Sequence, residues 1–581
     1  MKRLMIGNEA IAQGAWEAGA TVAAAYPGTP STEILEFFAR YPQVYAEWAP
    51  NEKVALEVGA GASLGGARTL VAMKHVGVNV AADPLFTLSY TGVNAGLVLI
   101  SADDPGMHSS QNEQDNRGYG RFAKLPVLEP SDSQEARDFV KLAFELSERF
   151  DTPVMVRLTT RIAHSQSLVE VGEREAVELK PYAKDAAKYV MLPGNARLRH
   201  LEVEKRMAAL REFADDTALN RIEWGTRERG IVTSGAAYQY VREVMPDASV
   251  LKLGLVNPLP ERLVREFAAG VGELVVVEEL EPVIEEQLRA WGLAARGKDL
   301  LPRTGEFSPE LLAERLLGRA PTPAYSVSAV IPPRPPLMCP GCPHRGVFYT
   351  LGRMHLTVCG DIGCYTLGAL KPLAAMDTTI CMGASIGAAL GMEKARGPEW
   401  AQKTVAVIGD STFVHSGITP LIDVVYNGGA TTVLILDNGT TAMTGHQQHP
   451  ATGRTLAGAE APRLDLEQVC RAVGVRRVRQ VDPLDLAGVE AALKEELAVR
   501  EPSVIIARRP CALLPEAALG QRTFRIDPDK CKGCKLCVRL GCTGVSWDEE
   551  TRLASINPDL CVGCGLCLQV CKLDAVLEGR A

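Results

Sequence analysis

The chain has 581 residues, of which 46% are hydrophobic and 23% are charged, and it carries a formal net charge of −8. The length predicts about three to five domains of roughly 150 residues each, and the composition is that of a globular protein. The negative charge and the lack of a basic tract argue against a nucleic-acid partner. No apolar run approaches the ~18 residues that cross a bilayer, and no signal peptide is visible, so we expect a cytoplasmic protein without a membrane partner.

Residues 1–180 predict a parallel α/β domain. β-Rich runs at residues 97–100 and 154–158 alternate with helical segments rich in Ala and Gly, which is the rhythm of a parallel sheet. Residues 181–227 are charged and lack the pattern of a strand, so they predict a helical linker.

A second α/β domain is predicted over residues 228–320, with strands at 230–233, 249–253 and 274–278. Six prolines between Pro321 and Pro336 predict an extended linker over residues 321–337. A third α/β domain is predicted over residues 338–520, with strands at 404–408, 432–436 and 503–507.

Polar residues follow two strands of the third predicted domain. Gly409, Asp410 and Ser411 come directly after one strand, and Asn438 comes directly after the next. A carboxylate and an amide at neighbouring strand ends can bind Mg²⁺ together with a backbone carbonyl and two oxygens of a diphosphate. The alternative is a pair of ordinary turns at which the strands end.

The last segment, residues 521–581, contains two runs of closely spaced cysteines. Three cysteines of each run can bind one 4Fe–4S cluster, while the fourth normally reaches across to the other cluster. Zinc also binds C-x2-C pairs but has no use for a third and fourth cysteine in each run. Fifteen cysteines in a reducing compartment favour metal or redox chemistry over disulfides. The two expected ligand sets are Cys531, Cys534, Cys537 and Cys571, and Cys542, Cys561, Cys564 and Cys567.

Several segments resemble one enzyme family. The Gly-Asp-Ser and Asn layout matches the thiamine diphosphate motif, and residues 26–33, Y-P-G-T-P-S-T-E, resemble the Y-P-x-T-P-S segment of 2-oxoacid:ferredoxin oxidoreductases. Residues 73–84, 409–417 and 440–447, together with the order of the domains, are similar to the α subunits of the branch that acts on indolepyruvate.

The resemblance implies a multidomain α/β fold. Residues 1–180 would be a pyrimidine-type and residues 338–520 a diphosphate-type thiamine diphosphate domain, each with a parallel sheet. Residues 228–320 would be transketolase-C-like, and residues 521–581 a ferredoxin-like α+β domain with two clusters. The Mg²⁺ ligands would be Asp410, Asn438 and the carbonyl of Thr440.

The resemblance also implies a reaction and its partners. An aryl pyruvate such as indolepyruvate would be oxidatively decarboxylated to an arylacetyl-coenzyme A, with electrons passing to ferredoxin. The family's γ-type domain is not visible in this chain, so a smaller subunit should complete a hetero-oligomer. A relative that acts on another 2-oxoacid, a non-oxidative thiamine decarboxylase and a pure electron-transfer subunit are the alternatives.

Two residues of the first domain have implied roles in catalysis. Thr29 should lie near the carboxylate of the oxoacid. A glutamate at the start of a helix rich in Gly and Ala should bind the aminopyrimidine ring of the cofactor and favour its imino tautomer. Glu52 fits this position through its distance to Gly77, and Glu57 is the alternative.

A third cluster, next to the thiamine diphosphate, is implied by a C-P-G-C segment and a later G-C segment. Its ligands would be Cys339, Cys342, Cys364 and Cys511, where Cys511 is chosen by its position near the end of the domain. The alternative is a vestigial site with Cys511 as a buried thiol. Four histidines fall inside matched segments and are either proton or phosphate partners or structural residues: His75, His344, His415 and His446.

Overall fold

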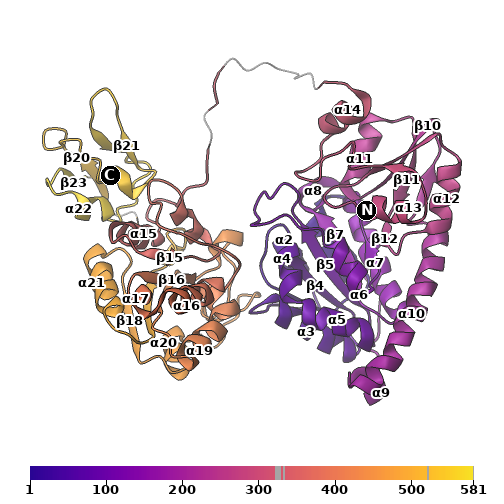
Figure 1. Cartoon of the computed structure of the whole chain (residues 1–581), viewed down its shortest axis with the longest axis horizontal. Coiled ribbons are helices and arrows are strands. Elements are labelled where there is room, and N and C mark those ends of the chain that lie inside the picture. The colour runs from indigo at the N-terminus through magenta and orange to yellow at the C-terminus, as the bar shows by residue number, and fades with distance from the viewer. Residues whose placement is uncertain (321–328, 332–333, 518, 520–521, 580–581) are drawn as a thin grey trace. The chain divides into compact units, whose positions relative to one another are not determined.

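The computed structural model describes residues 1–320, 329–331, 334–517, 519 and 522–579. They fall into two compact units, Met1–Ser328 (unit 1) and Ala329–Ala581 (unit 2) (Figure 1). The predicted proline-rich linker lies partly outside the described residues, at 321–328 and 332–333, and so do 518, 520 and 521 at the boundary predicted before the cysteine-rich tail. The domain boundaries predicted inside each unit stay predictions. No helix in the described ranges is both long enough and apolar enough to cross a membrane.

The described residues of unit 1 form a seven-stranded sheet in which only β12 and β6 are antiparallel neighbours. Its central strands are fully buried, which is typical of a parallel sheet covered by helices. In order across the sheet the strands are β12 (Leu255–Asn257), β6 (Val127–Leu128), β7 (Val154–Thr159), β5 (Leu97–Asp103), β4 (Thr69–Lys74), β2 (Val22–Ala25) and β3 (Tyr45–Trp48). Because β12 comes from residues 228–320, the sheet crosses a predicted domain boundary.

The helices around this sheet follow the pattern of buried residues. In α7 (Ser133–Phe150), Asp132 caps the helix by accepting a hydrogen bond from the N–H of Glu135 at 2.8 Å. Buried residues recur every three or four positions from Ala136 onward, so one apolar face packs against α1. The other helices are α1 (Gly7–Glu17), α2 (Thr32–Phe38), α3 (Glu52–Leu64), α4 (His75–Val80), α5 (Ala82–Thr91), α6 (Arg117–Ala123) and α8 (Thr160–His164). An antiparallel pair, β1 (Lys2–Ile6) and β8 (Gln166–Glu170), lies outside the sheet.

The second sheet of unit 1 has five strands in the described residues, and α10 (Pro193–Asp216), after the short α9 (Ala186–Tyr189), packs against α5 and α12. The strands are β14 (Ala295–Arg296), β13 (Glu273–Val277), β10 (Thr226–Ser234), β11 (Ala248–Leu253) and β9 (Arg221–Glu223). The helices are α11 (Gly235–Val244), α12 (Glu261–Ala269), α13 (Val283–Ala290) and α14 (Pro309–Leu317). The prediction that residues 181–227 lack strands is wrong for β9. Its charged residues lie at the edge of the sheet, where water solvates them, and they hid the strand pattern.

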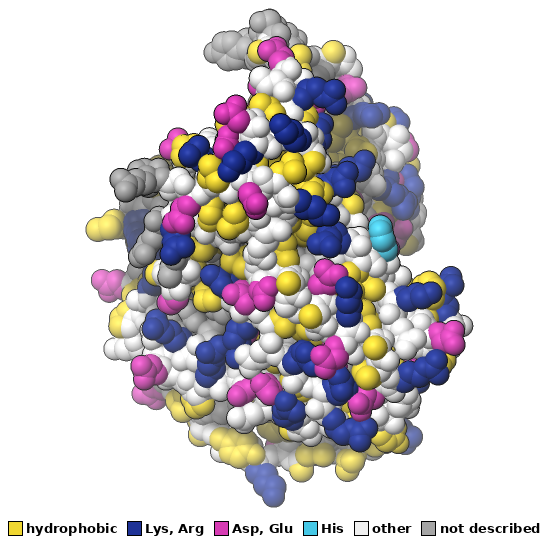
Figure 2. Space-filling model, turned by 90° about the vertical axis from the view of Figure 1, so that its left-hand side faces the viewer, with side chains coloured by type: hydrophobic (Ala, Val, Ile, Leu, Met, Phe, Trp, Pro, Cys, Tyr) yellow, Lys and Arg dark blue, Asp and Glu magenta, His cyan; other side chains and the backbone are white. Residues whose placement is uncertain are grey.

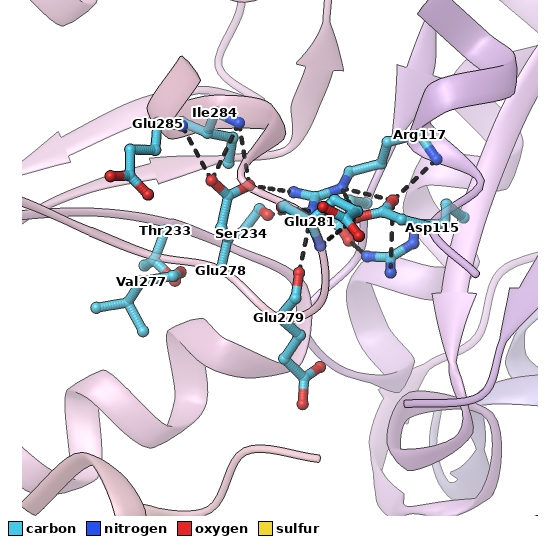
Figure 3. A network of polar contacts seen from close by, with 12 residues as sticks. Asp115, Arg117, Thr233, Ser234, Val277, Glu278, Glu279, Glu281, Ile284 and Glu285 are labelled. Carbon is cyan, nitrogen blue, oxygen red and sulfur yellow. Dashed lines mark hydrogen bonds and ion pairs between the residues drawn. The ribbon is translucent and has the colours of Figure 1, made fainter. Parts of the chain in front are cut away.

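A buried ionic network joins the two sheets of unit 1 (Figure 3). Arg117 donates to Asp115 Oδ2 at 2.5 Å and to Glu278 Oε2 at 2.7 Å. Glu278 also accepts hydrogen bonds from the N–H groups of Ile284 and Glu285, near the start of α13. Since Arg117 begins α6 and Glu278 follows β13, these bonds fix the second sheet against the first.

Unit 2 contains a sheet of five parallel strands in its described residues. In order they are β15 (Thr357–Cys359), β16 (Thr404–Gly409), β17 (Thr432–Asp437), β19 (Ser503–Arg508) and β18 (Arg477–Val481). The helices are α15 (His344–Arg353), α16 (Ala384–Arg396), α17 (Pro398–Ala401), α18 (Asp410–Thr412), α19 (Ile418–Tyr426), α20 (Leu466–Ala472) and α21 (Leu486–Leu497). Across both units, all eight strands predicted from the sequence are confirmed.

The tail of unit 2 is small and packs on the five-stranded part. Its strand pairs are antiparallel: β20 (Thr523–Ile526) with β23 (Val576–Gly579), and β21 (Val545–Trp547) with β22 (Ala554–Ile556). One helix, α22 (Leu566–Val570), follows β22. Phe524, Leu540 and Leu566 share a buried cluster with Tyr349 and Leu486, so the tail and the sheet of unit 2 have a common core.

Candidate active site and cluster sites

The predicted Mg²⁺ ligands lie at the carboxyl ends of two neighbouring strands. Asp410 begins α18 directly after β16, and Asn438 follows β17, which pairs with β16 in parallel. Asp410 is 3% exposed, Asn438 7% and Thr440 4%. Asp410 Oδ2 accepts a hydrogen bond from the N–H of Gly439 at 2.8 Å, so the two loops are tied together.

The Asp410 carboxylate is held in its ionised form. Burial alone would raise its pKa, but the His449 ring and the N–H groups of Ser411 and Gly439 outweigh burial, and the pKa of Asp410 is lowered. His449 Nε2 lies 3.4 Å from Asp410 Oδ2. An ionised carboxylate, an amide oxygen and a backbone carbonyl are the hard oxygen donors that Mg²⁺ prefers. The residues present therefore fit the predicted ion.

A hollow lined by arginines opens beside these residues. Asp437 and Asn438 form part of its wall. Arg508 Nε pairs with Asp437 at 2.6 Å, and Arg509 Nη1 pairs with Asp482 at 2.7 Å. Guanidinium groups suit phosphate oxygens because their fork of N–H donors matches them. The arginines that line the hollow are Arg454, Arg463, Arg508 and Arg509.

Four cysteines gather beside the same end of the sheet, and we call them the proximal set: Cys339, Cys342, Cys364 and Cys511. The N–H of Cys342 donates to the carbonyl of Cys339 at 3.1 Å, which closes one turn. Burial, together with the charges of Cys511 and Cys339, raises the pKa of Cys364 to about 11. The structure thus brings Cys364 within electrostatic reach of both. The N–H of Cys511 also donates to the carbonyl of Asn438 at 2.9 Å.

The eight cysteines of the tail line two separate pockets. The first tail set, which lines one pocket, is Cys531, Cys534, Cys537 and Cys571. The second tail set, which lines the other, is Cys542, Cys561, Cys564 and Cys567. In both pockets one cysteine comes from the other run, as the crossed spacing predicts. Within the described ranges no three His, Cys, Asp or Glu side chains converge as they would around a single metal ion. A cluster does not require such convergence, because each of its cysteines binds a different iron.

Glu52 is buried at the start of α3 in unit 1. It is 5% exposed, and Asn51 caps the helix by accepting a hydrogen bond from the N–H of Val54 at 3.0 Å. Gly77 packs against the Glu52 side chain, since a Cβ on Gly77 would lie 2.7 Å from Glu52 Oε1. The alternative, Glu57, lies on the outer face of α3 with a side chain that is 45% exposed and an ion pair to a neighbouring lysine. The structure therefore favours Glu52 as the buried acid.

Thr29 and His75 lie in unit 1 at the ends of two strands of the first sheet. Thr29 is half-buried in the loop between β2 and α2, and Asn8 Nδ2 holds this loop by donating to the carbonyl of Pro30 at 2.7 Å. His75 begins α4, and its Nε2 lies 3.2 Å from the carbonyl oxygen of Asn112. Burial lowers the pKa of His75 to about 4, so the ring is neutral at pH 7.

The other predicted histidines lie in unit 2, in different surroundings. Burial lowers the pKa of His344 to about 4, and the charge of Asp410 opposes this shift, so the two side chains interact. His446 Nε2 lies 3.8 Å from Cys511 Sγ. His415 is buried in the turn after α18.

Two residues of this site were not predicted from the sequence. His449 is 6% exposed, its Nδ1 has no hydrogen-bond partner among the described residues, and its Nε2 lies 3.4 Å from Asp410 Oδ2. Tyr365 donates its hydroxyl to the carbonyl of Ile362 at 2.8 Å and covers Gly409, where a Cβ would lie 2.8 Å from its ring. A signal for His449 was present, because it follows His446 by three residues in one polar loop. Tyr365 gave no signal that separates it from an ordinary core aromatic.

Three sequence families match the chain. Residues 13–221 match "Pyruvate flavodoxin/ferredoxin oxidoreductase, thiamine diP-bdg", a range that includes Thr29 and Glu52. Residues 361–507 match "Thiamine pyrophosphate enzyme, C-terminal TPP binding domain", which includes Asp410 and Asn438. Residues 554–577 match "4Fe-4S binding domain". Two thiamine diphosphate regions and one iron–sulfur region are therefore present in one chain.

Curated relatives are similar along nearly the whole chain. Indolepyruvate oxidoreductase subunit IorA of Archaeoglobus fulgidus is 41% identical and covers 94% of this chain and 93% of its own length. The protein of the same name from Methanothermobacter thermautotrophicus is 42% identical over 93% of this chain and 91% of its own length. The one from Pyrococcus abyssi is 41% identical over 98% and 96%.

Proposed function

Because this chain belongs to the family of indolepyruvate oxidoreductase subunit IorA, we propose that it converts an aryl pyruvate such as indolepyruvate to an arylacetyl-coenzyme A and passes the electrons to ferredoxin. The chain is a thiamine diphosphate-dependent oxidoreductase with iron–sulfur electron transfer. One observation carries the proposal: the N–H of Cys511 bonds to the carbonyl of Asn438. A candidate cluster ligand is thus adjacent to a candidate cofactor ligand, an arrangement that a non-oxidative decarboxylase does not need.

We assign the Mg²⁺ ligands as Asp410, Asn438 and the carbonyl of Thr440. The low pKa of Asp410 supports this role, since it supplies the fixed negative charge that the ion requires. Gly409 and Ser411 flank Asp410 and are proposed to contact the diphosphate. Thiamine diphosphate, when bound, supplies the electron sink that allows CO₂ to leave the 2-oxoacid.

We assign two roles to residues of unit 1. Glu52 holds a proton at the aminopyrimidine ring of the cofactor, and its burial and the packing of Gly77 support this role. Thr29 binds the carboxylate of the 2-oxoacid, supported by the anchoring of its loop through Asn8.

We assign three 4Fe–4S clusters, one each to the proximal set, the first tail set and the second tail set. The grouping of the tail cysteines in two pockets of four supports the tail assignments. The electrostatic interactions of Cys364 with Cys511 and Cys339 support the proximal one. Twelve cysteine ligands thus account for most of the fifteen cysteines in the chain.

The proposed partners are a smaller γ-type subunit, ferredoxin and coenzyme A. The arginines of the hollow in unit 2 are suited to the phosphate groups of coenzyme A as well as to a diphosphate. The face in Figure 2 carries apolar side chains between basic and acidic ones. Large apolar residues of unit 2 are exposed, among them Tyr426 at 84% and Leu513 at 61%, which supports contact with another subunit.

The function is tested by anaerobic turnover of the chain produced together with its small subunit. Each member of a panel of indolepyruvate, phenylpyruvate and branched 2-oxoacids is offered with and without coenzyme A, and reduction of a viologen is followed. We expect coenzyme A-dependent reduction, fastest with an aryl pyruvate. Release of CO₂ without any reduction of the viologen would favour the non-oxidative alternative.

The site assignment is tested with variants of the same complex. Asp410→Ala removes a charged metal ligand, so bound thiamine should fall sharply while the iron content stays unchanged. Glu52→Gln should slow cofactor proton exchange by roughly 10²-fold or more, whereas Glu57→Gln, a matched change on the outer face of α3, should not. The reverse result for the two glutamates would transfer the role to Glu57.

A further inference from the structure

Arg345 connects the proximal set to the tail. It lies in the first turn of α15 and is 2% exposed. Its Nη1 donates to the carbonyl of Leu540 at 2.8 Å, and its Nη2 donates to the carbonyls of Met338 at 2.6 Å and Cys339 at 3.1 Å. Leu540 belongs to the tail, while Met338 and Cys339 belong to the loop of the proximal set. One guanidinium therefore joins the two cysteine motifs.

The charge of Arg345 is not neutralised by the protein around it. Its partners are neutral carbonyls, and in the described part of unit 2 it forms no ion pair with a carboxylate. Its Nε is buried without a hydrogen-bond partner. A buried charge without a counter-charge is strongly destabilising. An anion close to this side chain would therefore stabilise the fold of unit 2.

The second tail pocket supplies the place for that anion. Arg345 and Gly341 line this pocket together with the second tail set. A Cβ on Gly341 would lie 2.6 Å from Val562 Cγ2, so the turn of the proximal set touches the loop that carries the second tail set. Arg345 is thus bonded to the carbonyl of Cys339 in the proximal set and lines the same pocket as Cys564 of the second tail set. Arg345 therefore acts on cysteines of both motifs.

We propose that Arg345 is the shared counter-charge of the proximal cluster and the second tail cluster. The inference rests on the proposed function, which assigns those clusters. A cluster bound by four thiolates is anionic, and its negative charge grows by one on reduction. A buried cation beside it therefore stabilises the reduced form and makes reduction easier.

The same geometry makes Arg345 the junction between the two clusters. The proximal set and the second tail set would each hold a cluster, and the clusters would supply one-electron transfer, in which one is oxidised and the other reduced by one electron. No bond forms or breaks and no proton moves. Because Arg345 stabilises the reduced form of both clusters, it keeps their potentials raised together, while the first tail cluster lies outside its pocket.

The test uses the full chain, purified anaerobically with its clusters, and three variants. Arg345→Gln removes the charge and keeps N–H donors, whereas Arg345→Lys keeps the charge. Arg353→Gln is the matched control, because it removes the same charge from the exposed end of the same helix, where the side chain is 54% exposed and water screens it. Iron content is measured first, and the midpoint potentials are then measured by redox titration followed by electron paramagnetic resonance.

In the Arg345→Gln variant we expect one-electron reduction of the proximal cluster and of the second tail cluster to be at least about tenfold less favourable, which is ~59 mV for one electron. The potential of the first tail cluster should stay unchanged. The Lys and Arg353→Gln variants should behave like the wild type. If the Gln variant loses iron and the Lys variant keeps it, the need for the charge is equally supported.

Two results would overturn the inference. Wild-type potentials in a fully loaded Gln variant would show that the charge does not act on the clusters. Equal damage in the Lys and Gln variants would show that the hydrogen bonds matter and the charge does not. Both results leave the clusters in place in the wild type, so they are distinct from failure of the proposed function, in which the wild type itself would lack iron at these cysteines.

Discussion

Arg117 and Arg345 are both almost fully buried, and their surroundings differ. Arg117 in unit 1 is 1% exposed and is bonded to the carboxylates of Asp115 and Glu278. Arg345 in unit 2 is 2% exposed, and its partners are backbone carbonyls. The difference teaches that unit 1 pairs its buried arginine with carboxylates, while unit 2 is inferred to balance its buried arginine with the thiolates of cysteines that bind clusters.

The network of unit 1 even holds an excess of acid. The buried carboxylates around Arg117 and Arg157 outnumber these two arginines. Burial raises the pKa of Asp103 and of Glu279 to about 7. Arg157 pairs with Asp103 at 2.7 Å and also with Glu129. In unit 1, protonation of buried carboxylates thus reduces an excess of negative charge. In unit 2, bound clusters are proposed to balance the positive charge of Arg345.

The comparison predicts that removal of iron affects unit 2 alone. Because cluster binding contributes to folding free energy, stripping the clusters from the full chain with a chelator should speed hydrogen exchange at least ~10-fold in the tail and around residues 338–345. Peptides that cover β5 and β7 of unit 1 should keep their protection. Hydrogen exchange followed by mass spectrometry measures both. Equal loss of protection in β5 would show that unit 1 also depends on the clusters.

Single cysteine variants should show that each tail site takes its fourth cysteine from the other run of the sequence. Cys571 belongs to the second run, yet it lines the pocket of the first tail set. Cys571→Ala should therefore remove about four iron atoms and leave both clusters that respond to Arg345→Gln. Cys567→Ala should instead remove one of those two, the second tail cluster. Iron analysis and electron paramagnetic resonance decide between the crossed pairing and a pairing within each run.

The sequence predicted the parts of the site that depend on local spacing. The strand ends that carry Asp410 and Asn438 and the cysteine runs are short-range patterns, and strands rich in β-branched residues are recognisable without tertiary contacts. Glu52 was chosen over Glu57 by a distance to Gly77, and the contact between Glu52 and Gly77 accords with that choice.

Other features depend on contacts between distant segments and gave no local signal. β12 joins a sheet whose other strands all precede it by more than ninety residues, and no local periodicity indicates such a partner. Arg345 follows the C-P-G-C segment, and its sequence context is that of any helical arginine. Its inferred role depends on a hydrogen bond to the carbonyl of Leu540, which lies far away in the sequence. β9 was hidden because its charged residues are typical of an exposed helix as much as of an edge strand.

Loss of the Arg117 charge should destabilise unit 1. Arg117→Met leaves Asp115 and Glu278 buried without their partner, and breaking a buried pair in this way costs about 3–5 kcal/mol. The control is Arg161→Met, which breaks an ion pair to Glu306 at an arginine that is 55% exposed and should cost at most ~1 kcal/mol. Urea unfolding read by hydrogen exchange of β5 and β7 gives both values. A cost for Arg117→Met as small as that of the control would contradict a self-contained network.

The smallest expected effect concerns pH and Glu279. Burial raises its pKa from 4.5 to about 7, against the opposing effects of the Phe307 N–H and Arg157. Between these pH values the folded protein holds a proton that the unfolded chain has released. The free energy of unfolding of unit 1 should therefore fall as the pH rises through this range, by up to ~1.4 kcal/mol per pH unit from this group. His75, with a pKa lowered to about 4, acts in the opposite direction up to about pH 6.5.

Glu279→Gln isolates this contribution, because Gln keeps an acceptor for the Phe307 N–H, which donates to Glu279 Oε1 at 2.8 Å, and cannot titrate. Its unfolding free energy, measured at pH 5, 6 and 7, should decline less steeply than that of the wild type, while Glu281→Gln, whose side chain is 61% exposed, should follow the wild type. Parallel profiles for Glu279→Gln and the wild type would mean that Glu279 is ionised across the range. The network would then hold an unbalanced negative charge, and unit 1 would need a cation from outside, as unit 2 is inferred to need an anion.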